Sequence, residues 1–138
     1  MNLDGKSLII AVDFDGTIVE DAYPKIGKPR LFAFETLKQL QGDGHRLILW
    51  TYRKGIRLQE AVEFCRKNGI EFYAVNHSFP EEEHDPSVSR KIDADIFIDD
   101  RNIGGLPSWG EIYHSITDNP PEHLKKKRKS LINRIFKW

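Results

Sequence analysis

The sequence predicts an α/β protein built on a parallel sheet, and three observations support this. Apolar runs rich in β-branched and aromatic residues recur along the chain, as expected for strands that are buried on both faces. Amphipathic helical patterns separate the first three runs. Alternation of strands and helices with short links is typical of parallel sheets with right-handed crossovers. The chain of 138 residues is also long enough for one domain with a hydrophobic core.

The predicted elements follow one another in a regular order. Strands are expected at about 7–14, 45–51, 71–76 and 94–100. A helix over roughly 31–41 joins the first two strands and ends at Gly42, and a helix over roughly 57–67 joins the next two and ends at Gly69. A further short amphipathic helix is expected from Trp109 to Ile116.

The end of the first strand carries the strongest functional signal. Its apolar run stops at Asp13 and Asp15, two carboxylates one residue apart, which are followed by Gly16 and Thr17. Ligands bind at the carboxyl ends of the strands in such sheets, and crowded carboxylates need a cation or a shared proton. Hard oxygen ligands suit Mg²⁺, which a substrate phosphate often completes. A carboxylate beside a metal-bound phosphoryl group can itself attack phosphorus and become an aspartyl phosphate.

These residues also resemble a known family. Asp13-Phe-Asp15-Gly16-Thr17 resembles the first motif of the haloacid dehalogenase (HAD) superfamily, Asp-x-Asp-x-Thr. Later stretches are similar to its other motifs in the expected order: a strand ending in Thr51, the Lys91 position, and a strand ending in Asp99-Asp100. The resembling region spans residues 8–100, which is most of the chain.

The resemblance implies a Rossmann-like three-layer α/β/α sandwich with strand order 3-2-1-4. HAD proteins usually carry a cap domain after the first motif or between the second and third. Here the segments left over, 18–30 and 76–90, have room only for a short flap and a loop. We therefore expect a capless protein with an open site, suited to a bulky or macromolecular phosphorylated substrate, or closed by a second subunit of a homo-oligomer.

The resemblance further implies a Mg²⁺-dependent phosphohydrolase that cleaves a phosphate monoester through an aspartyl phosphate. Asp13 would be the nucleophile, and Asp15 the general acid and then the base. Mg²⁺ would bind Asp13, the main-chain carbonyl of Asp15 and Asp99, while Asp100 would orient metal-bound water. The group expected to hold the phosphate consists of Thr51, Lys91, Gly16, Thr17 and Arg53.

Several assignments stay open at this stage. Either Arg90 or Lys91 can enter the site, and the spacing to Asp99 favours Lys91. Arg53 either grips the substrate at the site mouth or lies in solvent, and Arg101 and Asn102 share this ambiguity. The group of His77, His84 and the glutamates at 81–83 fits no familiar metal-ligand spacing, so a solvated loop is preferred to a second metal site.

The charge distribution separates a catalytic core, 1–120, from a basic amphipathic helix, 121–138. Residues 124–138 contain seven basic residues and no acid, although the whole chain has a net charge of zero. The helix either docks on the domain with its lysines in solvent or binds an anionic partner, such as nucleic acid, an acidic membrane surface or a second subunit. The second interpretation makes the protein a nucleic-acid end-processing phosphatase or a nucleic-acid-binding module.

The remaining composition narrows the class of protein. The one cysteine, Cys65, excludes an internal disulfide and shares a core stripe with Leu58 and Val62. The sequence shows neither a signal-peptide pattern nor a membrane-spanning apolar run, so we expect a cytoplasmic protein. A signalling receiver domain also combines acids, Thr and Lys on a parallel sheet, but the Asp-x-Asp-Gly-Thr arrangement on the first strand argues against it.

Overall fold

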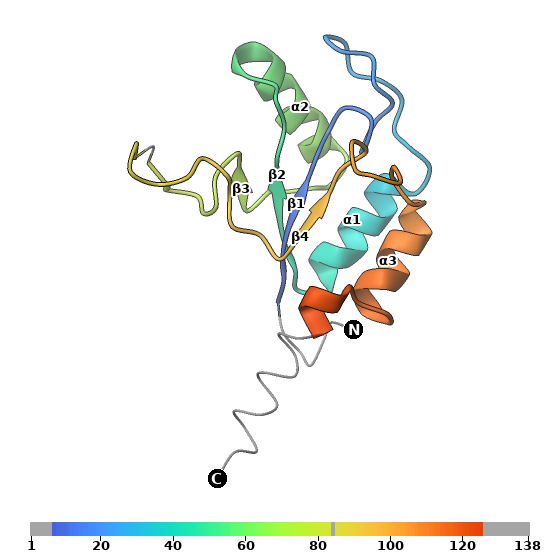
Figure 1. Cartoon of the computed structure of the whole chain (residues 1–138). Coiled ribbons are helices and arrows are strands. Elements are labelled where there is room, and N and C mark those ends of the chain that lie inside the picture. The colour runs from blue at the N-terminus through green and yellow to red at the C-terminus, as the bar shows by residue number, and fades with distance from the viewer. Residues whose placement is uncertain (1–6, 84, 126–138) are drawn as a thin grey trace.

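The computed structural model describes residues 7–83 and 85–125 and shows a sheet with helices packed against it (Figure 1). Its elements, in chain order, are β1 (Ile9–Val12), α1 (Ala33–Gly42), β2 (Arg46–Leu49), α2 (Gly55–Lys67), β3 (Ala74–Val75), β4 (Ile96–Ile98) and α3 (Trp109–Thr117). Each lies within or close to a range predicted from the sequence. The strands are shorter than predicted, because the apolar runs continue beyond the residues that pair.

The sheet has the strand order β3-β2-β1-β4, and every pairing is parallel. Ile10 of β1 pairs with Leu47 of β2 on one side and with Ile96 of β4 on the other. The predicted parallel α/β sheet with order 3-2-1-4 is therefore confirmed. Because β1 is flanked by β2 and β4, the carboxyl ends of these three strands meet at one edge of the sheet.

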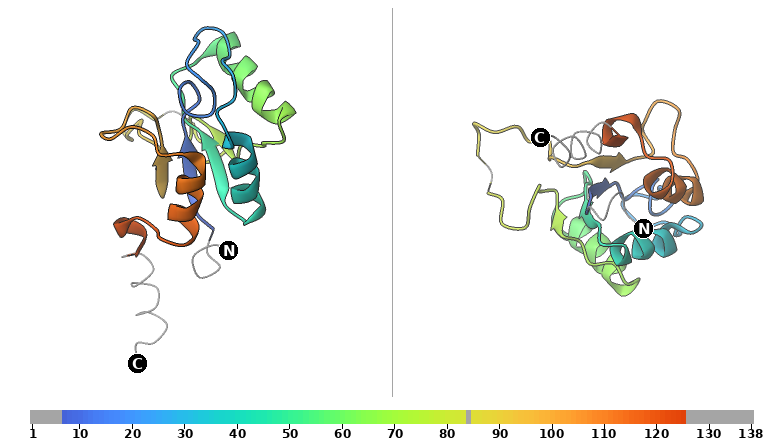
Figure 2. Two further views of the ribbon diagram at one scale, coloured as in Figure 1. Left: turned by 90° about the vertical axis from the view of Figure 1, so that its right-hand side faces the viewer. Right: turned by 90° about the horizontal axis from the view of Figure 1, so that it is seen from below.

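The helices α1, α2 and α3 each contribute to the hydrophobic core on one face of the sheet. Strand residues that alternate along the chain point to opposite faces, so Ile10 and Val12 join this core and Ala11 does not. The core includes Leu37 of α1 and Cys65 of α2, together with Trp109, Ile112 and Ile116 of α3. Figures 1 and 2 show the helices on this side, and the connection between β3 and β4 reaching out on the other side.

The opposite face has a thinner cover. Ala11, Ile48 and Ala74 of the sheet form a small cluster there with Ile92, which comes from the irregular connection between β3 and β4. Among residues 7–83 and 85–125 no helix covers this face, so the expected three-layer sandwich has an irregular chain as its third layer. The reason lies in the sequence of this connection, which contains two prolines and an acidic run and no helical periodicity.

The flap after β1 is short, and it is not a cap domain. Glu20 N–H donates to the Lys28 carbonyl and Arg30 N–H donates to the Ile18 carbonyl, both at 2.8 Å, so the two arms pair like a hairpin. Ile18 and Val19 are fully buried at its base. The prediction of a capless fold holds for the part of the chain that the structure describes.

The chain continues past α3 into a helical turn at residues 122–125, where Leu124 is buried in the main core. Residues 126–138, on which the prediction of a basic helix depends, lie outside the described residues. None of the helices in the described ranges combines the length and apolar character needed to cross a membrane.

Candidate metal-binding and catalytic site

Three carboxylates converge at the carboxyl edge of the sheet. Asp13 follows β1 directly, Asp99 and Asp100 follow β4, and Asp13 N–H donates to the Ile98 carbonyl at 2.9 Å. One carboxylate oxygen from each of Asp13, Asp99 and Asp100 lies within 4.8 Å of the other two. The structure thus brings together three of the four acids expected at the metal site, whereas the Asp15 carboxylate pairs with Arg53.

The environment of Asp13 opposes its ionisation. Burial, a hydrogen bond with Asp100 and the charge of Asp99 raise the pKa of Asp13 to about 7. A divalent cation among the three carboxylates would remove this penalty by balancing their charge. An all-oxygen set of acidic ligands fits Mg²⁺, because this ion prefers carboxylate oxygens and water.

Thr17 holds two of these acids in place. Its fully buried hydroxyl lies 3.0 Å from Asp13 Oδ2 and 3.2 Å from Asp100 Oδ1, and it accepts the Asp100 N–H at 3.0 Å. The Thr17 carbonyl accepts a hydrogen bond from the Trp109 indole at 3.1 Å. Thr17 was expected to bind phosphate, but its hydroxyl contacts acids. Trp109 was expected as part of a short amphipathic helix, a pattern that carries no signal of this contact.

Gly16 allows the chain to pass close to Asp100. Its φ is +84°, and a Cβ at this position would lie 2.2 Å from Asp100 Oδ2. Its N–H donates to the Val19 carbonyl at 2.7 Å, so the N–H of Gly16, a residue expected to help hold the phosphate, serves the turn. Only glycine meets both requirements without displacing a carboxylate.

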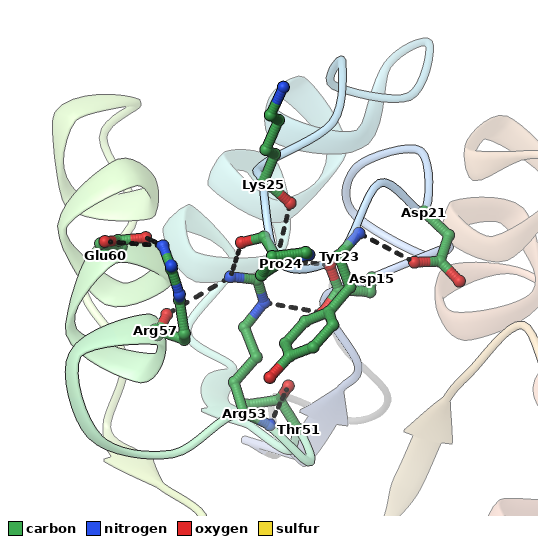
Figure 3. Close-up of polar contacts among 9 residues, drawn as sticks. All are labelled: Asp15, Asp21, Tyr23, Pro24, Lys25, Thr51, Arg53, Arg57 and Glu60. Atoms are coloured by element: carbon green, nitrogen blue, oxygen red, sulfur yellow. Dashed lines mark hydrogen bonds and ion pairs between the residues drawn. The ribbon is translucent and has the colours of Figure 1, made fainter.

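Arg53 is buried, which corrects the expectation of a solvated or substrate-gripping side chain. It is 1% exposed and forms a bidentate ion pair with Asp15, with both N–O distances at 2.7 Å (Figure 3). The hydrogen bond to Asp15 raises the pKa of Arg53 further. The ion pair could not be foreseen because the two residues lie 38 positions apart in the chain.

A cavity of about 350 Å³ opens beside the acids. Its walls are formed by Asp13, Asp15, Trp50, Thr51, Tyr52, Asp99 and Arg101. Thr51 is held there through its N–H, which donates to Asn76 Oδ1 at 2.8 Å, and Asn76 itself has a φ of +56°. Asn76 follows β3 at the same edge of the sheet, and sequence reasoning treated it only as the start of a loop.

Lys91 does not line this cavity. Its ammonium lies over the Phe97 ring, 5.4 Å from the centroid, and Phe97 belongs to the cluster on the thinly covered face of the sheet. Arg90, in contrast, lines a larger neighbouring cavity of about 980 Å³ that shares Trp50 and Thr51 with the first. The preference for Lys91 over Arg90 is therefore not supported by the geometry.

Acidic residues are the main charged groups in the wall of the larger cavity. Its walls include Glu81, Glu82, Glu83 and Asp85, together with His77, which lies 3.9 Å from Glu82. These residues form no metal-binding group with one another in the described part of the chain, where the detected group is that of Asp13, Asp99 and Asp100. His84, the other histidine of the predicted pair, lies outside the described residues.

The fold and the site define a class of protein: a parallel α/β protein with clustered acids at the carboxyl edge of its sheet. Comparison with protein-family models and with curated proteins finds no match. A solved structure, that of a conserved protein of Bacteroides thetaiotaomicron, is 56% identical and superimposes with a TM-score of 0.79. The match covers 84% of this chain and 94% of that one, so the chain belongs to the same family as this conserved protein.

Proposed function

We propose that the protein is a Mg²⁺-dependent phosphohydrolase of the capless HAD type, which cleaves a phosphate monoester through an aspartyl phosphate. The convergence of Asp13, Asp99 and Asp100 at one edge of the sheet carries this proposal. Asp15 and Thr51 line the same cavity as Asp13, so a nucleophile, a proton carrier and a hydroxyl group share one space. Mg²⁺ held by the three acids would balance the charge between Asp13 and the phosphoryl group.

In this proposal Asp13 and Asp15 carry out both chemical steps. In the first step a carboxylate oxygen of Asp13 forms a bond to phosphorus, and the bond from phosphorus to the leaving oxygen breaks. The leaving oxygen takes the bonding electrons together with a proton from Asp15. In the second step Asp15 removes a proton from water, the water oxygen attacks phosphorus, and the Asp13 carboxylate and inorganic phosphate are released.

Thr51 and Arg101 would hold the phosphoryl oxygens, because both line the cavity beside Asp13. A hydroxyl group and a guanidinium both donate hydrogen bonds to phosphoryl oxygens, and the guanidinium also offsets their charge. Arg90 stands further out, in the wall of the larger cavity.

A nucleic-acid substrate is the lesser proposal. The basic segment that motivated it lies outside the described residues, and the acids in the wall of the larger cavity would repel a polyanion close to Thr51. Comparing a 5′-phosphorylated oligonucleotide with a small ester at low and high salt distinguishes the two substrates. A faster reaction with the oligonucleotide that weakens with salt would favour the polymer.

The proposed function is tested by phosphate release from a panel of monoesters, with and without Mg²⁺. Asp13→Asn should reduce turnover by at least ~10³-fold, or roughly 4 kcal/mol of barrier, because an amide is not an anionic nucleophile. Asp21→Asn, at an exposed position of the flap, is the matched control and should keep its activity. If Asp13→Asn retains more than about a tenth of wild-type turnover, Asp13 is not the nucleophile.

A further inference from the structure

Arg53 stands out as a fully buried cation whose donors all have partners within the described chain. Nε donates to Asp15 Oδ2 and Nη2 to Asp15 Oδ1, both at 2.7 Å. The side chains of this ion pair are 0% and 1% exposed. A buried guanidinium is costly unless it is paired and hydrogen-bonded, so this geometry depends on both partners.

The other edge of the same guanidinium reaches the flap. Nη2 donates to the Lys25 carbonyl at 2.9 Å, and Nη1 donates to the Pro24 carbonyl at 3.2 Å (Figure 3). Nη1 also lies 3.5 Å from the Arg57 carbonyl at the start of α2. Arg53 thus has no donor left over for a substrate.

The surroundings of Arg53 connect it to the rest of the site. Its guanidinium carbon lies 5.1 Å from the centroids of the Phe14 and Tyr23 rings, and Phe14 stands between Asp13 and Asp15 in the chain. The Arg53 N–H donates to Thr51 Oγ1 at 3.2 Å. Arg53 therefore contacts the turn after β2, the flap, and Asp15, the residue proposed to transfer the proton.

We propose that Arg53 is a positioning residue that fixes the Asp15 carboxylate for proton transfer and fastens the flap to it. This inference rests on the proposed function for the role of Asp15. Each carboxylate oxygen has two lone pairs, and Arg53 occupies one on each, so a lone pair remains to carry a proton. Holding the carboxylate plane in one orientation keeps that proton directed at the substrate.

The fork shape of the guanidinium matters as much as its charge. Lysine offers a single ammonium, which cannot hold both Asp15 oxygens in one plane and reach two flap carbonyls as well. Arg53→Lys should therefore have a kcat/KM between that of Arg53→Met and that of the wild type.

The test compares two phosphate esters that differ in their need for a proton. Glycerol 2-phosphate releases an alkoxide that must be protonated, whereas 4-nitrophenyl phosphate releases a stable phenolate. For Arg53→Met, kcat/KM should fall by about 10²-fold or more with glycerol 2-phosphate and by less than about 10-fold with 4-nitrophenyl phosphate. Because kcat/KM reports the first bond cleavage, slow hydrolysis of the aspartyl phosphate does not disturb this comparison. Arg57→Met, which removes a surface ion pair with Glu60, is the matched control and should change neither value.

The flap supplies a readout that does not depend on activity. Hydrogen exchange at the amides of Glu20 and Arg30, which pair the two arms of the flap, should speed up in Arg53→Met and stay unchanged in Arg57→Met. If Arg53→Met does not fold, the losses of kcat/KM with the two esters and the exchange rates of the flap amides are measured on Arg53→Lys.

The outcomes separate the two proposals. Equal losses with both esters would overturn the positioning role, and unchanged exchange at the flap amides would overturn the fastening of the flap. Failure of the wild type to cleave either ester with Mg²⁺ would overturn the phosphohydrolase and, with it, the role in proton transfer. Hydrogen exchange at the flap amides would then still test whether Arg53 fastens the flap.

Discussion

Gly16→Ala is a small substitution with a large expected effect, because the new methyl group has no room. It would lie 2.2 Å from Asp100 Oδ2 and 2.7 Å from Asp100 Cγ, so the carboxylate must move. A φ of +84° costs a residue with a Cβ about 1–2 kcal/mol, and moving Asp100 weakens its hydrogen bonds with Thr17 by about 1 kcal/mol each. We expect a loss of about 2–4 kcal/mol in the free energy of unfolding.

The same displacement should weaken metal binding, since Asp100 belongs to the three-acid group. Loss of a partner that orients metal ligands typically lowers metal affinity by about 10–100-fold, and we expect a loss of this order when Asp100 is displaced. Urea unfolding without metal measures the stability, and calorimetric titration with Mg²⁺ measures the affinity.

Gly110→Ala is the matched control for this experiment. Gly110 lies in the first turn of α3, and a Cβ there would meet no atom within 4 Å. Alanine should leave stability unchanged or raise it by up to about 1 kcal/mol, and Mg²⁺ affinity should stay the same. If Gly16→Ala unfolds at the same urea concentration as this control and binds Mg²⁺ with the affinity of the wild type, the inference that the packing of Gly16 against Asp100 stabilises the site is refuted.

Other consequences can be measured with the same methods. Without metal, the raised pKa of Asp13 (about 7, against 3.8 when unfolded) stabilises the protein fully below pH 3.8, and this contribution is lost as the pH rises through 7. Stability relative to Asp13→Asn should therefore fall over this range in urea unfolding, and saturating Mg²⁺ should reverse the fall; a constant difference would contradict the raised pKa. Arg90→Met should raise KM for phosphate esters more than Lys91→Met, because Arg90 lines the cavity that Thr51 also lines and Lys91 does not, and the reverse order in initial-rate kinetics would restore Lys91 to the site. Trp109→Phe removes the indole donor to Thr17 and should cost about 1 kcal/mol in urea unfolding, while an unchanged midpoint would make that hydrogen bond negligible.

The sheet and its cluster of acids could be predicted because they depend on local patterns. Each strand is a short apolar run that ends in a polar residue, and parallel pairing places all these ends at one edge. Once β1 is known to lie between β2 and β4, the proximity of Asp13, Thr51 and Asp99 follows from the register.

The contacts that long connections make could not be predicted in this way. The burial of Arg53 depends on Asp15 and on flap carbonyls that carry no side-chain signal. The orientations of Arg90 and Lys91 depend on an irregular connection without periodicity, so these neighbours have different surroundings: Arg90 lines the larger cavity, and Lys91 lies over the Phe97 ring.

The uneven covering of the two faces of the sheet has a consequence for how this family can diversify. The side packed by helices carries most of the core, whereas the described residues of the connection between β3 and β4 contribute one buried apolar side chain, Ile92. Insertions and deletions in this connection should be tolerated, since few buried contacts depend on its length. The same connection forms most of the wall of the larger cavity next to Thr51. We expect relatives to differ in length here, and substrate preference to change along with this connection while the acids at the sheet edge stay the same.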